Sequence, residues 1–173
     1  MPTATAIIIG NEILSGKFTD ENGPWLAAQC RGLGLDLHRI VVIPDRIETI
    51  AQEVLQASVA SDHVFTTGGI GPTHDDKTME GVAAAFSVSM VRCEELEALI
   101  RARMGAKVNE AALQMADVPE GTVLWTEPDL KFPVVVCRNV VIFPGVPSFF
   151  RAKFAAISHR FKGVIVQSRQ FRT

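Results

Sequence analysis

Apolar residues recur along this chain in two alternating patterns, short continuous runs and stripes at helical spacing. Three runs, at residues 3–10, 35–43 and 62–69, are rich in β-branched or other apolar side chains. Runs of this kind are typical of strands that are buried on both faces, as they are in a parallel sheet. They predict three strands in the first part of the chain.

Stripes at helical spacing follow each of these runs. The clearest stripe begins at Ile47 and continues at i+3, i+4, i+7, i+8 and i+11, which is the spacing of one helix face. Asp45 before it and Glu48 within it predict an aspartate version of the capping box. Residues 24–34 and 77–86 are also predicted as helices. The resulting β-α-β-α-β-α order predicts an α/β fold, a three-layer α/β/α sandwich with a mainly parallel sheet.

The rest of the chain continues with shorter elements. Residues 94–118 have a helical pattern in two pieces, with a break near Gly105. The runs "GTVLW", "FPVVVC" and "NVVIFPG" then predict three strands, and a tight turn at Arg138–Asn139 separates the last two. An amphipathic helix is predicted over 147–161, and residues 163–173 have the pattern of one further strand.

The composition is that of an ordinary globular domain, and it argues against several classes of function. Hydrophobic residues make up 47% and charged residues 21% of the 173 residues, which suits one compact domain with a sizeable core. Lys and Arg number 17 against 19 Asp and Glu, so no basic surplus indicates a nucleic-acid partner. No apolar run reaches membrane-spanning length. The three cysteines are widely spaced, which favours free thiols in a reducing compartment, and we expect a cytoplasmic protein.

Four loops are predicted to meet at one edge of the sheet: 10–22, 44–45, 68–76 and 144–147. In a parallel α/β sheet the loops after the strands gather along one edge, and ligands bind there. Three of these loops precede a helix N-terminus, where backbone N–H groups favour negative charge. The acidic side chains in the loops are Glu12, Asp20, Glu21, Asp45, Asp75 and Asp76.

The stretch "TTGGIGPTHDDKT" combines glycines with two adjacent carboxylates. Gly68, Gly69 and Gly71 let backbone N–H groups approach an anion closely, whereas Asp75 and Asp76 would repel it. Two like charges ~4 Å apart cost ~4 kcal/mol at an effective dielectric constant of about 20. The stretch therefore predicts a divalent cation between the carboxylates and a phosphate, or a proton shared by the two aspartates.

Simpler interpretations fit the same stretch. One of Asp75 and Asp76 could cap the helix that begins near Lys77, and the glycines could serve only a tight turn. The stretch is not a phosphate-binding P-loop, because Asp76 stands where that motif needs a glycine before its lysine. Nor does "GGIGPT" match the dinucleotide fingerprint G-x-G-x-x-G.

Four motifs, in order along residues 4–162, resemble one known family. The motifs "GNEILSGKFTDEN", "VIPD", "GGIGPTHDDKT" and "FPGVP" resemble those of the molybdopterin-binding-like (MoCF biosynthesis) family. The resemblance lies in the branch of the CinA and FAD synthase amino-terminal domains. It implies a MogA/MoaB-like fold over residues 1–162, and a homo-oligomer, either a dimer or a trimer. It also implies that residues 163–173 begin a following subdomain of a longer chain.

The same resemblance implies a metal-dependent pyrophosphatase that acts on ADP-ribose or FAD with Mg²⁺, Mn²⁺ or Co²⁺. Under this hypothesis Asp75, Asp76 and Glu12 hold the metal. Catalysis is assigned to Asp76, Asp75 and Asp45, and the residues do not show which carboxylate is the base. The Thr78 hydroxyl would donate to a phosphate. The substrate-binding residues are predicted to be Gly68, Gly69, Gly71, Thr73, Thr78, Asn22 and Gly145.

Two other functions fit the same motifs. The first is a protein that binds a pterin ligand and adenylylates it, although such family members usually carry a basic residue where this chain has His74 and Asp75. The second is a non-catalytic regulatory or oligomerisation domain. CinA-like chains usually have an acidic residue shortly after the Pro-Gly-x-Pro turn, and this chain has Ser148, Phe149 and Phe150 there.

Overall fold

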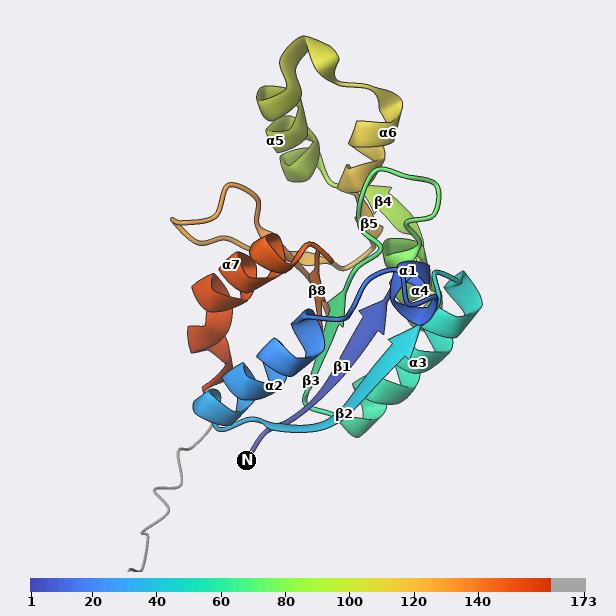
Figure 1. Cartoon of the computed structure of the whole chain (residues 1–173). Helices are drawn as coiled ribbons and strands as arrows, with labels where there is room; N and C mark the ends of the chain where they lie inside the picture. The colour runs from blue at the N-terminus through green and yellow to red at the C-terminus, as the bar shows by residue number, and fades with distance from the viewer. Residues whose placement is uncertain (163–173) are drawn as a thin grey trace, which may run out of the picture.

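The computed structural model describes residues 1–162, and a six-stranded sheet forms its centre (Figure 1). In sheet order the strands are β2 (Asp36–Ile43), β1 (Thr3–Ile9), β3 (His63–Thr67), β8 (Val140–Phe143), β7 (Val134–Cys137) and β6 (Val123–Trp125). β1 pairs in parallel with β2 and β3, and β3 pairs in parallel with β8. β7 and β6 complete the sheet in antiparallel orientation. The predicted mainly parallel sheet is confirmed.

The antiparallel end of the sheet follows from the turn between β7 and β8. Cys137 pairs with Val140 across this turn, and Arg138 takes a positive φ of 53° within it. Two residues can reverse a strand but cannot form the long crossover that parallel neighbours need. The predicted turn at Arg138–Asn139 is confirmed. The strand predicted over 163–173 lies outside the described residues.

Helices α2 and α7 cover one face of the sheet (Figure 1). α2 spans Asn22–Leu33 and α7 spans Pro147–Ile157. Their apolar side chains pack with alternate residues of the central strands, and all of these are buried. Phe65 and Phe143 from the sheet meet Phe150 and Phe154 of α7 at ring-centroid distances of 5.1–5.9 Å. The interlocked aromatic rings fix the position of α7 against the sheet.

Helices α3 (Ile47–Ala60) and α4 (Thr78–Ala85) cover the other face. The predicted stripe of α3 is buried there in part, with Ile50 and Val54 in the core and Leu55 48% exposed. Gly81 of α4 lies where an added Cβ would be 2.3 Å from Ile50, so glycine allows the two helices to approach closely. Helices on both faces complete the three layers, and the predicted α/β/α sandwich is confirmed.

A small unit, residues 90–119, stands beyond the carboxyl ends of the parallel strands (Figure 1). It contains β4 (Met90–Arg92), α5 (Glu94–Met104), α6 (Glu110–Leu113) and β5 (Asp117–Pro119), with β4 and β5 antiparallel. The two predicted helical pieces and their break at Gly105 are confirmed, since Gly105 has a φ of 54°. The strand pair was not predicted, because strands of three residues have no readable period.

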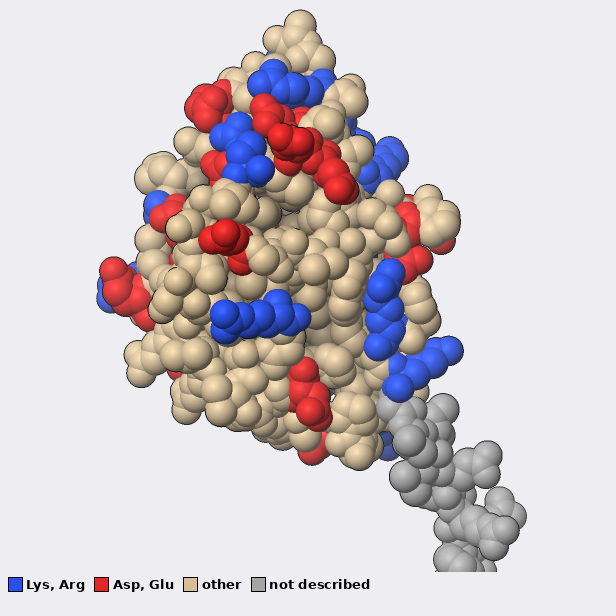
Figure 2. All heavy atoms as spheres, turned by 180° about the vertical axis from the view of Figure 1, so that it is seen from behind, with Lys and Arg blue, Asp and Glu red and all other residues tan. Residues whose placement is uncertain are grey.

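Charged side chains of both signs alternate over this 90–119 unit, at the top of Figure 2. Arg92 lies at the centre, with its guanidinium 2.6 Å from Asp117, 3.3 Å from Glu110 and 3.7 Å from Glu97. The cluster ties β4, β5, α5 and α6 together. Among residues 1–162, no helix has the length and apolar character needed to cross a bilayer.

Candidate functional site

A cleft of about 1400 Å³ opens at the carboxyl edge of the parallel strands. Three of the four predicted loops line it, 10–22, 68–76 and 144–147, together with α5 and the segment 129–133. Small-molecule sites usually measure about 300–1000 Å³, so the cleft has room for a ligand with more than one ring system. The predicted convergence of these three loops is confirmed.

The glycine loop takes a shape that only glycine allows. Gly68 has a φ of 102°, and a Cβ there would lie 2.1 Å from the carbonyl oxygen of Ile9. Gly69 has a φ of 71°, and its Cβ would lie 2.2 Å from the hydroxyl oxygen of Thr78. Both the backbone angle and the lack of space therefore exclude a side chain. The prediction of glycines that serve a tight turn is confirmed for these two positions.

Thr78 holds this loop and is fully buried. Its hydroxyl donates to the carbonyl oxygen of Gly68 at 2.8 Å, and its amide donates to the carbonyl oxygen of Gly69 at 3.1 Å. The hydroxyl proton is thus used within the loop. The donation from Thr78 to a phosphate stays a prediction, and it would require the hydroxyl to leave the carbonyl group of Gly68.

Three consecutive amides of the loop have no acceptor within residues 1–162: those of Gly69, Ile70 and Gly71. All three residues line the cleft and are at least partly exposed. Adjacent free N–H groups are the donors that an anionic oxygen prefers. The loop can therefore bind an anion, in agreement with the interpretation of its glycines.

The adjacent aspartates point to different surroundings. Asp76 lines the cleft, and its Oδ2 accepts from the amide of Thr73 at 2.9 Å and from the Thr73 hydroxyl at 2.7 Å. Asp75 is 75% exposed outside the cleft lining, with its Oδ1 3.3 Å from Nε2 of His74. Neither aspartate caps α4, whose N-cap Lys77 has no side-chain bond. Substrate binding by Thr73 stays a prediction, and in the ligand-free structure its hydroxyl donates to Asp76.

Asp45 does not form the predicted capping box. Its Oδ2 accepts from the amide of Asn11 at 2.9 Å, and its amide donates to Oδ1 of Asn11 at 3.2 Å. The N-cap of α3 is Arg46, which has no side-chain cap bond. The capping prediction is wrong because the carboxylate joins two loops at the same edge of the sheet. The two residues of that contact are 34 positions apart in the chain, so a local sequence pattern cannot predict it.

Burial is the main cause of a raised pKa at Asp45, and nearby negative charges from Glu12, Asp76 and Asp75 add to it. The Asn11 amide acts in the opposite direction. Glu12 and Asp76 also line the cleft. The charges of three other predicted acidic residues thus act on Asp45, although Asp45 itself does not line the cleft.

Replacing Asp45 by Asn should raise the melting temperature of the ligand-free protein at pH 7. A carboxyl whose folded pKa is raised contributes stability below its unfolded pKa, near 4, and loses it as the pH rises through the folded value. Asparagine keeps an oxygen for the Asn11 amide and removes the charge. Thermal denaturation at pH 7 and at about pH 3.5 should show a gain that shrinks at the lower pH. A variant that melts lower at pH 7 would contradict the assignment.

The carboxylates do not form a closed metal cage. Within residues 1–162, no three His, Cys, Asp or Glu side chains lie close enough together to hold an ion. Mg²⁺ is usually held by one or two carboxylates together with phosphate oxygens from the substrate. Glu12 and Asp76 at the cleft fit that second kind of site, so a divalent cation that binds with its ligand remains a prediction.

Asn22 connects three of the loops. Its Nδ2 donates to the hydroxyl oxygen of Thr67 at 2.8 Å and to the carbonyl oxygen of Gly145 at 2.9 Å. The Thr67 hydroxyl in turn donates to the carbonyl oxygen of Pro144 at 2.9 Å. Asn22 is 5% exposed, and its Oδ1 is buried at the cleft with no hydrogen-bond partner. A buried acceptor without a donor is costly, and a ligand hydroxyl or N–H group would satisfy it.

Gly145 and Asp20 have structural roles at the same edge. A Cβ on Gly145 would lie 3.1 Å from the Cα of Gly68, so the loop after β8 can pack on the glycine loop. Asp20 accepts from the amides of Asn22 and Gly23 at the start of α2. Its carboxylate thereby caps that helix.

Sequence reasoning missed Lys153 of α7, which lines the cleft. It falls on the apolar stripe that Phe150, Phe154 and Ile157 form on the same helix. A charged residue inside an apolar stripe is a signal that could have been read. Apolar side chains of the 90–119 unit were also missed as part of the site, because their approach to the cleft depends on tertiary packing: Leu96, Ile100 and Met115.

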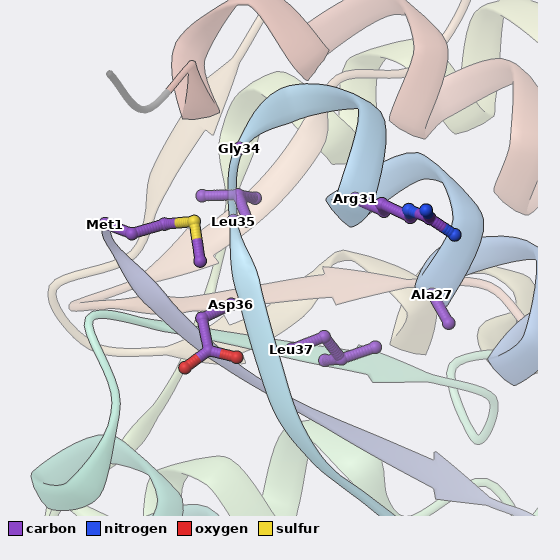
Figure 3. Close-up of a pocket in the computed structure, with 7 residues that line it drawn as sticks. All are labelled: Met1, Ala27, Arg31, Gly34, Leu35, Asp36 and Leu37. Carbon is purple, nitrogen blue, oxygen red and sulfur yellow. The ribbon is translucent and has the colours of Figure 1, made fainter. Parts of the chain in front are cut away.

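A second hollow of about 310 Å³ lies at the other end of the sheet (Figure 3). It is bordered by Ala27 and Arg31 of α2 and by Asp36 and Leu37 at the start of β2. This hollow lies at the amino end of β2, whereas the loops of the cleft lie at the carboxyl ends of the parallel strands. None of the predicted site residues borders this hollow.

A family model described as "Probable molybdopterin binding domain" matches residues 5–162. The chain belongs to this family. The match covers both faces of the sandwich, the glycine loop and α7, and it confirms the resemblance found in the sequence motifs. The cleft at the carboxyl edge is therefore a feature of a molybdopterin-binding-like domain.

Several relatives are similar over most of this chain. A protein of Archaeoglobus fulgidus is 38% identical over 157 residues, which cover 90% of this chain and 67% of the relative. A probable FAD synthase of Caenorhabditis elegans is 37% identical, over 88% of this chain and 34% of its own length. A CinA-like protein of Prochlorococcus marinus is 36% identical, over 82% and 35%. The chain thus spans about a third of the FAD synthase and CinA-like relatives.

Solved structures of similar fold agree with this family. The protein CinA of Thermoplasma acidophilum has a TM-score of 0.85 and 30% identity, covering 92% of this chain and 98% of that one. The molybdopterin biosynthesis enzyme MoaB of Thermus thermophilus has a TM-score of 0.59 and 19% identity, over 92% and 91%. The second match supports the fold alone. Both confirm the predicted MogA/MoaB-like architecture.

Proposed function

We propose that the cleft binds a nucleoside diphosphate-linked compound and hydrolyses its diphosphate bond with the help of a divalent cation. The observation that carries the proposal is the row of free amides at Gly69, Ile70 and Gly71 beside a group of carboxylates. The amides favour phosphate oxygens, and the carboxylates favour a cation. A diphosphate bound together with a metal ion satisfies both.

The chain's own groups have distinct parts in this reaction. The free amides would bind phosphate oxygens, and the Asn22 Oδ1 would accept a hydrogen bond from a ligand hydroxyl. Glu12 and Asp76 would hold the cation, which supplies positive charge against the charge that develops on phosphorus oxygens. Asp45 stands behind the cleft lining but beside the glycine loop, with its Oδ1 3.4 Å from the position that a Cβ on Gly69 would take, and it would take the proton of the attacking water. The oxygen of the attacking water would form a bond to one phosphorus atom. The bond between that phosphorus and the bridging oxygen would break, and the bridging oxygen would leave with the other phosphate, which gives two phosphate monoesters.

The names of relatives support this class of ligand. The nematode relatives are named as probable FAD synthases, and FAD is a dinucleotide whose halves are joined by a diphosphate. A cleft of about 1400 Å³ also exceeds what one nucleoside requires. These two points favour a ligand that carries ring systems on both sides of its phosphates.

The test is to measure the release of AMP from ADP-ribose and from FAD with Mg²⁺, Mn²⁺ or Co²⁺. We expect turnover with at least one cation and none after EDTA treatment. We also expect equilibrium dialysis to detect tight cation binding only when a diphosphate ligand is present, because the chain supplies too few ligands alone. No turnover of either compound with any of the three cations would refute the proposal.

A second function is favoured by the family description, which names molybdopterin. In that case the cleft would bind the pterin, and the chain would adenylylate it. Tight binding of molybdopterin without hydrolysis of ADP-ribose or FAD would support this alternative. A non-catalytic regulatory or oligomerisation domain would show neither, and no ligand or metal would raise its melting temperature. A dimer or trimer is part of our proposal, and light scattering of the purified chain measures it.

A further inference from the structure

Lys153 is a half-buried cation that lines the cleft without a carboxylate partner. Its Nζ donates to the backbone carbonyl oxygen of Pro133 at 3.2 Å. No ion pair within residues 1–162 involves this side chain. Lysine is seldom buried unless it is paired with an acidic group. Its charge is thus not explained by a contact of the ligand-free fold.

Holding Lys153 in this position disfavours its charged form. Burial lowers the pKa of Lys153 from 10.5 to about 8. One hydrogen bond to a neutral carbonyl group does not replace the water that an ammonium group loses. An apolar residue on this stripe of α7 would serve the core better, since Phe150 and Phe154 beside it are fully buried. Burial therefore disfavours the positive charge in the free protein, and the place of Lys153 in the cleft lining leaves the charge open to an anionic group of a ligand.

The surroundings of Lys153 indicate what it can contact. Phe149 precedes it by one helical turn on the same face of α7, and both line the cleft. Phe149 is 61% exposed, so the fold does not cover this face. The free amides of Gly69, Ile70 and Gly71 line the same cleft from another element. A ligand that fills the cleft can reach both the amides and Lys153.

We propose that Lys153 binds an anionic group of the ligand, a phosphate in the compounds considered above, and so selects charged ligands over neutral ones. The inference rests on the proposed function and assigns a ligand contact to Lys153 of α7, which lines the cleft together with two other cationic side chains, Arg103 and Lys131. Lys153 serves in binding and takes no part in proton transfer. A charge-assisted hydrogen bond from Nζ should contribute about 10- to 100-fold in affinity.

The experiment measures binding by calorimetry with Mg²⁺ present. The charged probe is the ADP-ribose analogue in which a methylene group replaces the bridging oxygen, so that no turnover occurs. The neutral probe is adenosine. The proteins are the wild type, Lys153→Met, Lys153→Arg and the charge-matched control Lys107→Met, whose lysine is exposed and lies outside the cleft.

We expect Lys153→Met to bind the charged probe about 10- to 100-fold more weakly than the wild type. Lys153→Arg should remain within about fivefold of the wild type, because arginine keeps the charge. Lys107→Met should match the wild type, and adenosine should bind all four proteins alike. The melting temperature of ligand-free Lys153→Met should rise by about 2–6 °C at pH 7, whereas a structural role would lower it.

Two results would overturn the inference while leaving the proposed function intact. One is a wild-type protein that binds the charged probe no better than Lys153→Met does. The other is a lower melting temperature for Lys153→Met, which would show that its contact with Pro133 stabilises the fold. A wild type that binds no charged probe at all would instead refute the proposed function, and this inference with it.

Discussion

Asp76→Asn should lower the rate of ADP-ribose or FAD hydrolysis by about 100-fold or more. Asp76 is the aspartate of the pair that lines the cleft. Its Oδ2 lies 3.0 Å from the position that a Cβ on Gly71 would take, so the carboxylate is next to the glycine loop. Asparagine has the same shape and can still accept from Thr73, so the loop should keep its fold. Initial rates at saturating cation, with melting temperatures as a check on folding, measure the effect.

Asp75→Asn is the matched control, because it makes the same change one residue earlier. The Asp75 side chain is 75% exposed and lies outside the cleft lining. Solvent and salt screen an exposed charge, so the loss of activity should be less than about 10-fold. Equal losses in the two variants would contradict this placement. They would favour the interpretation of both aspartates as joint metal ligands.

Gly68→Ala should destabilise the protein by about 2–5 kcal/mol. Two effects add at this position. A φ of 102° is unfavourable for any residue with a side chain, and the new Cβ would lie 2.1 Å from the carbonyl oxygen of Ile9. That oxygen belongs to the last residue of β1, a strand paired on both sides, so the backbone there has little freedom to move aside. Urea denaturation followed by circular dichroism measures the free energy of unfolding.

Gly121→Ala separates the two effects. Gly121 has a φ of 88°, and a Cβ there would meet no atom within 4 Å. Its substitution should cost only the backbone term, about 1–2 kcal/mol. If Gly68→Ala cost no more than this control, the close approach of the glycine loop to β1 would be wrong. The loop's free amides would then have no fixed position for a phosphate.

Asp45 and Lys153 show the same relation between stability and binding. Each carries a charge that burial disfavours, which raises one pKa and lowers the other. Neither is paired with an opposite charge within residues 1–162. Functional sites often retain such groups at a cost in stability. We therefore expect variants of both residues to be more stable and less active than the wild type.

Strong local periodicity made most of the fold predictable. The apolar run of β1 is buried, with Ile7 fully buried, and the stripe of α3 buries Ile50 and Val54 but leaves Leu55 48% exposed. The antiparallel orientation of β7 and β8 could be inferred only indirectly, because the turn between them is too short for a crossover connection. The β4–β5 pair was missed because three-residue strands are held by their partner and by the ion pairs of Arg92, which no local pattern contains.

The candidate site was predictable in outline and less so in detail. Loops after parallel strands must share an edge, so the gathering of Asn22, Gly69 and Gly145 followed from topology. The partners of individual side chains did not. The Thr78 hydroxyl donates to the carbonyl group of Gly68, and the Asp45 carboxylate accepts from the amide of Asn11. Buried polar groups take whichever donor or acceptor the packed fold brings within reach.

The sequence by itself determined the layers of this domain, the edge at which its loops meet and the glycines that keep one loop free of side chains. These depend on short-range periodicity and on backbone angles, which neighbouring residues specify. Only the tertiary structure decided which carboxylates share the cleft, and that Lys153 of α7 faces it. Those contacts join residues far apart in the chain. Their cost in desolvation and repulsion exists only once packing has excluded water.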